Sequence, residues 1–380
     1  MSTFVVFGAI YSFGTFFTAM ADDFGAGSAA TSMFFALTTF SCYVFGAVTG
    51  RMLDHVGPRR ILVAGAAFLG LGMLLTAAAE TLWVAYLTYG LGIGLAVACG
   101  YVPMIATVSA WFDRGRATAL GIAVSGIGAG TLVVAPLSGA LIDRYGWRTA
   151  FVALGIGGAA LLLLSAALAS APAALAIDRS SPSLGTALRS PAFASMYVSM
   201  LLVAAAMFVP IVFVAPYAVS HGTSTVAAGA LIGVIGVSSI VGRLMLGVLA
   251  DRFGPLVVYQ ASYAIVAVSM LVWVSSTAYG WLVVFAAFFG TGYGGFAALA
   301  PAVLAEKFGL QGLGGVMGLL YTSAGLGGLL GPPLAGAAID ATASHTVSIL
   351  GAMAAAAVAF AVLAPLGRLS AGARRAEPLT

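Results

Sequence analysis

Apolar residues fill most of this chain in runs of about 20 residues, and short polar segments separate the runs. A helix of that length crosses the hydrocarbon core of a bilayer, which is roughly 30 Å thick. The pattern therefore predicts an all-α membrane protein with twelve transmembrane helices. The predicted spans are residues 2–21, 28–50, 60–79, 82–110, 118–142, 148–171, 191–219, 225–250, 255–276, 279–305, 313–339 and 344–367.

A short signature, Gly-x-x-x-Asp, ends four of these runs. Its aspartates are Asp54, Asp143, Asp251 and Asp340. The first two are 89 residues apart, as are the last two, and the second half repeats the first at an offset of 197 residues. A unit that is doubled and then doubled again is typical of membrane transporters built from nested inverted repeats.

The same offset aligns the fifth predicted span with the eleventh. Small residues allow helices to pack closely, and proline permits bending, so both spans suit helices that rock against each other. The aligned pairs are Gly121 with Gly318, Gly128 with Gly325, Gly130 with Gly327, Pro136 with Pro333, and Gly139 with Gly336.

The longest polar interruption covers residues 173–190 and separates six spans from six. We expect it to be a cytoplasmic linker between an N-terminal six-helix half, 1–172, and a C-terminal half, 191–380, with a short cytoplasmic tail. The first span begins almost at Met1, so we expect its helix to be truncated at that end.

Composition supports a bilayer environment and leaves no part of the chain for a soluble enzyme. The chain is 62% hydrophobic and 7% charged, with a mean hydropathy of +1.11. No nucleophile–base pair, metal cluster or carboxylate pair lies within the spans, so we expect no enzyme activity, cofactor or metal. Cys42 and Cys99 are interpreted as small apolar residues of the helices.

The arginines and lysines predict the orientation. Of 15 such residues, 12 fall in loops on the side of the two termini and only Arg144 and Arg148 fall on the other side. This bias places both termini in the cytoplasm. The basic residues do not alternate with aromatic residues in a patch, so nucleic acid is not an expected partner. We expect a monomer in the cytoplasmic membrane of a bacterium.

The remaining cation, Arg243, is the strongest candidate for chemistry. It precedes Asp251 by eight residues, which places it about 12 Å inside the core, near the midplane. A charge there is costly and indicates function. Ser239 and two glycines form a small, polar stripe beside it. The equivalent repeat positions are Gly46, Ala135 and Pro332, so the scaffold itself does not require a cation. The alternative is a structural arginine that binds helix-end carbonyls or Glu306.

Four segments resemble one family. Residues 50–60 (Gly-Arg-Met-Leu-Asp-His-Val-Gly-Pro-Arg-Arg) and 247–254 resemble the loop 2–3 and loop 8–9 signatures of the major facilitator superfamily. Residues 111–121 are similar to loop 4–5 of its monocarboxylate transporter and oxalate–formate antiporter branch, and residues 325–336 resemble helix 11 of that branch. The resemblance covers the whole chain and implies a bacterial member with the twelve-helix fold.

The resemblance implies that Arg243 holds a substrate carboxylate, which a guanidinium can bind with two parallel N–H donors. The chain departs from relatives in three places. Ala324 stands where the oxalate antiporter has a lysine. Thr15 and Ser239 stand where animal monocarboxylate transporters have a lysine and an aspartate. One cation without an acidic partner favours a monoanion such as lactate or pyruvate.

We therefore expect a secondary transporter that moves a small organic monoanion by alternating access, together with a proton. Anion exchange, efflux of drugs or metabolites, and a transporter-like sensor stay open as alternatives. The predicted substrate site contains Arg243, Tyr101, Tyr321, Thr15, Ser239 and Thr322, with Tyr11 and Tyr293 as further lining candidates. The predicted gating residues are Asp54, Arg59, Asp251, Arg252, Asp143 and Arg116.

Overall fold

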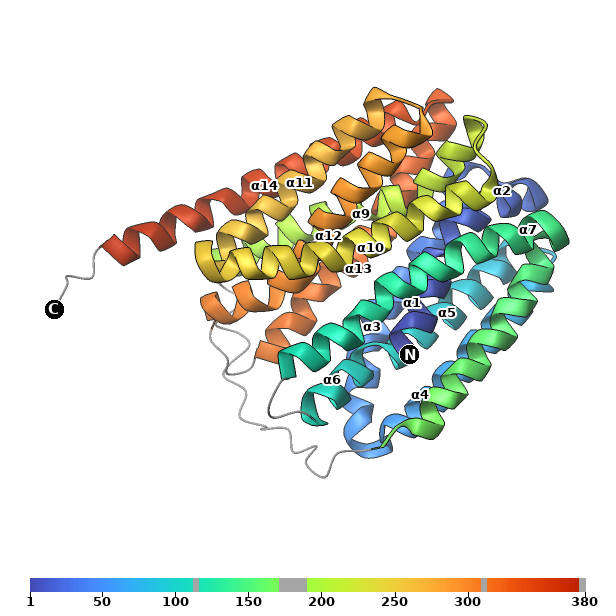
Figure 1. Ribbon diagram of the computed structural model, residues 1–380, viewed down its shortest axis with the longest axis horizontal. Helices are drawn as coiled ribbons and strands as arrows, with labels where there is room; N and C mark the ends of the chain where they lie inside the picture. Colours follow the sequence, from blue (N-terminus) through green and yellow to red (C-terminus); the bar gives the residue numbers. More distant parts are fainter. Residues whose placement is uncertain (112–115, 171–189, 309–312, 376–380) are drawn as a thin grey trace.

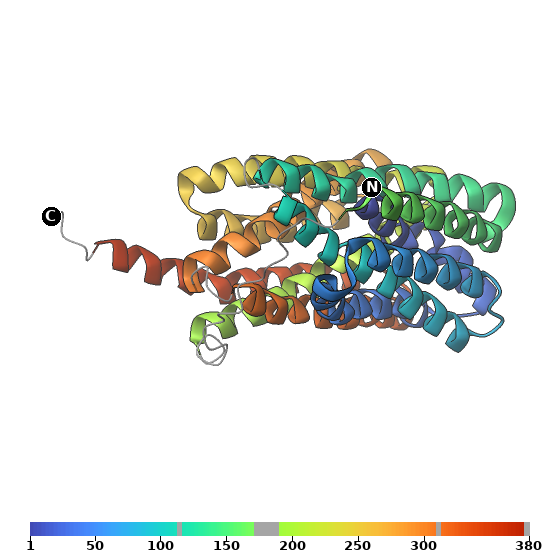
Figure 2. The same ribbon diagram turned by 90° about the horizontal axis from the view of Figure 1, so that it is seen from below.

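The computed structural model describes residues 1–111, 116–170, 190–308 and 313–375, without the side chains of residues 54, 116–118, 120–121, 313–315 and 367–375. All regular elements in these ranges are α-helices, and they form two groups that lie side by side (Figures 1 and 2). The first group contains α1 (Ser2–Tyr11), α2 (Phe13–Phe24), α3 (Ser28–Val56), α4 (Pro58–Ala77), α5 (Leu82–Gly100), α6 (Val102–Trp111) and α7 (Arg116–Leu168). The second contains α9 (Pro191–Ser220), α10 (Thr225–Phe253), α11 (Pro255–Ser275), α12 (Tyr279–Phe308), α13 (Leu313–Thr342) and α14 (Thr346–Arg375).

These helices confirm the predicted fold class. Within the described ranges, nine helices are long and apolar enough to cross a membrane, or ten when the bent pair α1–α2 is one span. The long helix α7 supplies two spans, because Gly146 turns the chain at φ 79° and ψ 161°, a conformation that favours glycine. Helix α13, which has 30 residues and covers the eleventh predicted span, is not among these nine.

Two of the spans are broken, which the apolar pattern did not predict. The first bends by 40° between α1 and α2, where the Ser12 hydroxyl donates to Ala9 O (2.9 Å). The fourth breaks at Tyr101, two residues before Pro103, because proline has no N–H and crowds the preceding turn. The linker prediction, residues 173–190, lies outside the described residues except for Ser190, which caps α9 by accepting from Phe193 N (3.1 Å).

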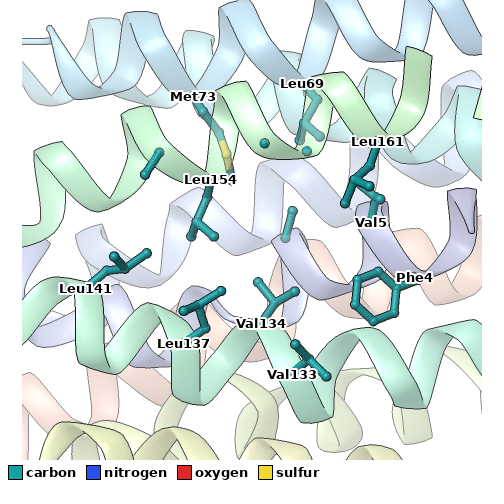
Figure 3. Close-up of a pocket in the computed structure, with 14 residues that line it drawn as sticks. Phe4, Val5, Leu69, Met73, Val133, Val134, Leu137, Leu141, Leu154 and Leu161 are labelled. Atoms are coloured by element: carbon teal, nitrogen blue, oxygen red, sulfur yellow. The ribbon is translucent and has the colours of Figure 1, made fainter. Parts of the chain in front are cut away.

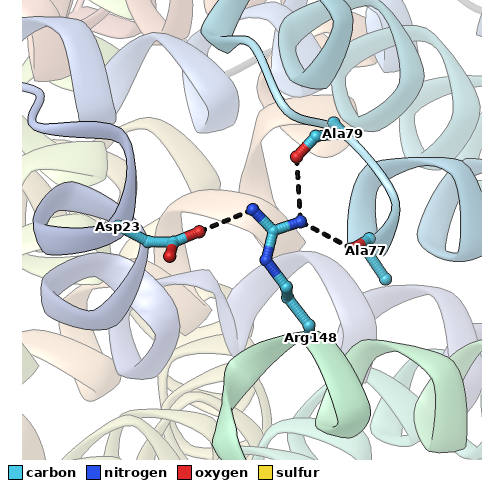
Figure 4. Close-up of polar contacts among 4 residues, drawn as sticks. All are labelled: Asp23, Ala77, Ala79 and Arg148. Atoms are coloured by element: carbon cyan, nitrogen blue, oxygen red, sulfur yellow. Dashed lines mark hydrogen bonds and ion pairs between the residues drawn. The ribbon is translucent and has the colours of Figure 1, made fainter.

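The turn at Gly146 lies at the opposite end of the bundle from the C-terminus (Figures 1 and 2). We call this end the outer end, following the orientation predicted from the arginine bias. At the outer end Arg148 joins three helices of the N-terminal half (Figure 4). Its guanidinium donates to the carbonyl oxygen of Ala77, the last residue of α4 (2.7 Å), and to that of Ala79 just after the helix (2.8 Å). It also forms an ion pair with Asp23 of α2 (2.7 Å).

The two halves meet along the pairs α3–α13 and α7–α10, with α2 against α9. At the centre of the α7–α10 pair, backbone packs directly on backbone. A Cβ atom at Gly236 would lie 2.7 Å from the carbonyl oxygen of Gly128 on the other half. Such close approach is possible only for glycine.

Candidate functional site

Arg243 lies about two-thirds of the way along α10, where the two halves meet. Its Nη1 donates a hydrogen bond of 3.2 Å to the carbonyl oxygen of Val124 in α7, across the interface. Its Nε atom is buried and has no hydrogen-bond partner among the described residues. The side chain as a whole is half-buried. One backbone carbonyl therefore leaves most of the donor capacity of the guanidinium unused.

No acidic side chain described by the structure forms an ion pair with Arg243. Glu306, the alternative partner considered from the sequence, is exposed near the inner end of α12. Val124 is also in the interior of a helix rather than at its end. The structural alternative for Arg243 thus lacks both of the partners that the sequence analysis gave it.

Three tyrosines lie close enough to the guanidinium to feel its charge. Tyr11, Tyr101 and Tyr293 all interact electrostatically with Arg243. The hydroxyls of Tyr11 and Tyr293 are hydrogen-bonded to each other (2.6 Å) and so join α1 of one half to α12 of the other. Tyr101 occupies the break between α5 and α6. A cation among neutral hydroxyl groups, each able to donate a hydrogen bond, is suited to binding an anion.

A second pair of rings lies next to this group. Tyr321 of α13 stacks on Tyr43 of α3, with the ring centroids 6.1 Å apart, again across the halves. Tyr321 also interacts electrostatically with Tyr101 and Tyr293. The sequence analysis missed Tyr43. The available signal was its position in the second span, one turn before Gly46, which is the repeat equivalent of Arg243.

For the other predicted site residues, no contact with Arg243 is described. Ser239 is buried one turn before Arg243 and donates to Gly236 O (2.7 Å). Thr322 is engaged with the hydroxyl of Tyr197 (3.1 Å) on α9 and donates to Leu319 O. Thr15 lies in α2, just after the bend between α1 and α2. It is buried, and its hydroxyl has no hydrogen-bond partner among the described residues.

On the outer side of the tyrosines, phenylalanines close the space between the halves. Phe17 of α2 packs on Phe213 of α9 with the centroids 5.1 Å apart, and Phe35 packs on Phe208 at 5.5 Å. In contrast, Tyr43, Tyr101, Tyr293 and Tyr321 are all half-buried although they lie within the bundle. The route from the site to the outer end is therefore closed in this conformation.

Two cavities of the structure can be compared with the site. A cavity of about 10 Å³ lies beside Tyr11, Ser239 and Tyr293, which is room for about one water molecule. A cavity of about 430 Å³ lies elsewhere, between α1, α4 and the two limbs of α7 (Figure 3). It contains none of the predicted site residues, and its lining is apolar, so it is not suited to an anion.

The predicted gating residues are only partly described. The side chains of Asp54 and Arg116 lie outside the described residues. Arg59, Asp251 and Asp143 are exposed at helix ends, and the Arg252 guanidinium lies over the Phe253 ring at 5.5 Å. The structure gives none of these four residues an ion pair with another described side chain. Their gating roles therefore stay predictions.

Comparisons with known proteins identify the fold and the family. The family model of the Major Facilitator Superfamily matches residues 1–278 and 196–378. Two solved transporters share the fold at low sequence identity. The nucleoside transporter NupG has a TM-score of 0.76 and 13% identity, covering 96% of this chain and 98% of its own. A bacterial homologue of the human lysosomal transporter Spinster, in an inward-facing and unoccupied conformation, has a TM-score of 0.73 and 15% identity, covering 95% and 96%.

Curated relatives narrow the family further. Monocarboxylate transporter 11 of Mus musculus is 32% identical over 363 residues, which is 90% of this chain and 80% of the relative. Monocarboxylate transporter 3 of Rattus norvegicus is 30% identical over 366 residues, covering 90% and 74%. These relatives are transporters rather than enzymes. This multi-pass membrane protein therefore belongs to the major facilitator superfamily, in the branch that contains the monocarboxylate transporters.

Proposed function

We propose that this protein is a secondary transporter of small organic monoanions such as lactate or pyruvate, with Arg243 as the residue that binds the carboxylate. The observation that carries the proposal is the guanidinium at the interface of the halves, without an acidic partner among the described side chains and next to three tyrosine hydroxyls. A carboxylate can accept from the free donors of Arg243 and from a phenol at the same time.

The transport cycle follows from where this group lies. Arg243 and Tyr293 belong to one half, and Tyr11 and Tyr101 belong to the other. A substrate held by all four groups contacts both halves, so its binding favours the conformation in which they converge. Rocking of the halves then opens the site first to one side and then to the other. In a bacterial cytoplasmic membrane, with both termini inside, the closed phenylalanine side faces outward.

The proton in this proposal travels with the substrate or along the hydroxyl pair. Arginine does not release a proton at physiological pH. A carboxylic acid can carry its own proton, and the 2.6 Å hydrogen bond between Tyr11 and Tyr293 gives a second route across the halves. Exchange of one anion for another needs neither route, and the transport assay separates the two modes.

The test is uptake of labelled lactate, pyruvate, formate and acetate into proteoliposomes, with and without an inward proton gradient. Arg243→Ala should remove saturable uptake, because losing hydrogen bonds from a charged donor weakens binding by roughly 10- to 150-fold. Arg243→Lys should restore little of the uptake, because an ammonium group lacks the two parallel N–H donors of a planar guanidinium. Arg144→Ala, a change of an exposed arginine at the outer end, is the matched control.

Uptake of lactate by Arg243→Ala at the unaltered rate would refute the proposed role of Arg243. A proton gradient that drives accumulation supports symport. Uptake that occurs only when the vesicles contain a second anion establishes exchange instead.

A further inference from the structure

The outer end contains a contact between the halves that uses neither the tyrosines nor the phenylalanines. Asp340, near the end of α13, places both carboxylate oxygens on the first turn of α3. Oδ1 accepts from Ser28 N at 2.7 Å, and Oδ2 accepts from Ala29 N at 2.9 Å. These two amides belong to the N-terminal half and the carboxylate to the C-terminal half. Asp340 therefore caps a helix that is 312 residues away in sequence.

Helix α3 has no cap of its own. Its N-cap residue is Gly27, which has no side chain to accept from the free amides. The equivalent helix of the other half, α10, begins after Ser224, whose hydroxyl accepts from Ala227 N (3.4 Å). One half thus caps its helix internally, whereas the other depends on its partner half.

Close packing fixes the position of the carboxylate. A Cβ atom at Gly336, one turn before Asp340, would lie 2.6 Å from Ala29 N. A Cβ atom at Gly27 would lie 2.8 Å from Asp340 Oδ2. The contact therefore requires glycine on both sides and holds only while the outer ends of α3 and α13 touch.

The repeat supplies an internal comparison. Asp143 is the counterpart of Asp340, at the same offset of 197 residues. A Cβ atom at Gly139 would lie 2.9 Å from Thr225 O, much as one at Gly336 would meet α3. Asp143 is exposed, and the structure gives it no hydrogen bond or ion pair with a described residue. Two equivalent aspartates therefore differ in whether they cap the facing helix.

We propose that Asp340 is the closing contact of the outer gate. Its carboxylate caps α3 while the outer side is closed and releases Ser28 and Ala29 when that side opens. The negative charge at the positive end of the α3 dipole stabilises the closed conformation. This inference rests on the proposed alternating access, but its readout is the distance between the halves, and no substrate is needed.

Two spin labels measure that distance in the protein in nanodiscs, at Ala78→Cys after α4 and Thr277→Cys after α11, both exposed at the outer end. The native Cys42 and Cys99 are buried. Asp340→Ala should raise the ratio of outward-open to outward-closed molecules by about 5- to 30-fold, the effect of losing a helix cap worth one or two kcal/mol. Asp143→Ala, the matched control, should leave the ratio unchanged, a result that would also remove the gating role that the sequence analysis predicted for Asp143.

A second variant tests the contact without changing the aspartate. Gly27→Ser gives α3 its own cap, as Ser224 does for α10, and its Cβ displaces the carboxylate of Asp340. It should shift the ratio in the same direction, and adding Asp340→Ala to it should produce little further change.

Identical distance distributions for Asp340→Ala and the unaltered protein would overturn the inference, as would an equal shift in Asp143→Ala. A shift in Asp340→Ala and Gly27→Ser supports it even if no monocarboxylate is transported. In that case the role of Asp340 in the outer gate is supported and the proposed substrate is contradicted.

Discussion

Two arginines of this chain show how surroundings decide the role of one residue type. Arg148 at the outer end has three partners within its own half and a ring beneath it, Trp147 at 4.6 Å. Arg243 in the core has one carbonyl, which belongs to the other half. The guanidinium of Arg148 is occupied by contacts within the fold, whereas that of Arg243 has N–H donors that remain free for a ligand. The difference lies in their contacts and not in their charge.

His345 gives a prediction of pH dependence. It lies in the turn before α14, outside the spans, and its ring packs on Tyr217 (centroids 5.2 Å apart) and Phe213 (6.5 Å). Burial lowers the pKa of His345, and the neighbouring His221 lowers it further. The fold therefore favours the neutral ring. The resulting stabilisation is full above the ordinary histidine pKa of about 6.5 and is lost as the pH falls from there through the lowered pKa of the folded state.

The melting temperature should consequently decline between pH 7 and pH 5, and His345→Gln should remove the part of the decline that this ring causes. His55→Gln, at an exposed position at the inner end of α3, should keep the full decline. If the His345→Gln and unaltered proteins give the same profile, the ring does not carry this dependence.

At the scale of elements, the Arg148 contacts predict that the outer ends of α2, α4 and the second limb of α7 move together. Arg148→Gln leaves the carbonyls of Ala77 and Ala79 without their charged donor and Asp23 without its partner. Because both side chains of the ion pair are 39% exposed, solvent weakens the ion pair. We expect a loss of about 1–2 kcal/mol, mostly from the carbonyl bonds.

Thermal unfolding monitored by tryptophan fluorescence measures this loss. Arg144→Gln is the control, because Arg144 is exposed and contacts the Tyr145 ring (5.4 Å) rather than another helix. Equal melting temperatures for the two variants would contradict the prediction.

The elements also show which features the sequence could predict. The spans follow from the length of the apolar runs, so the sequence could predict them. The depth of Arg243, inferred from its distance to Asp251, stays a prediction. The bend at Ser12 could not be predicted, because serine is compatible with a straight helix and the bend reflects packing. The contact of Asp340 was also hidden. Four aspartates carry the same signature, and it was the fold that showed Asp340 reaching a helix of the other half.

At the scale of the whole molecule, the approach of the halves depends on glycines of α7 and α10. Gly236→Ala would place a Cβ atom against Thr131 Oγ1 and Gly128 O and so force the halves apart. We expect a cost of about 1–3 kcal/mol, as for other overpacked sites, together with slower transport. Gly247→Ala lies on the same helix, where no atom lies within 4 Å of the added Cβ, and should be neutral or stabilising.

Melting temperature and initial uptake rate measured on both variants test this prediction. A Gly236→Ala protein as stable and as fast as Gly247→Ala would show that the α7–α10 contact relaxes without penalty.

The hydrogen bond from Arg243 to Val124 has a consequence for the coupling between substrate binding and the contact of the two halves. The bond joins the halves through the same group that is to receive the anion. A carboxylate bound at Arg243, as proposed, can use the free donors and leave the hydrogen bond to Val124 in place. If the carboxylate takes Nη1 instead, it displaces the Val124 carbonyl, and ligand affinity and this one contact between the halves become reciprocally coupled. A change that removes only the Val124 hydrogen bond then tightens binding, and a change that strengthens it weakens binding by the same factor.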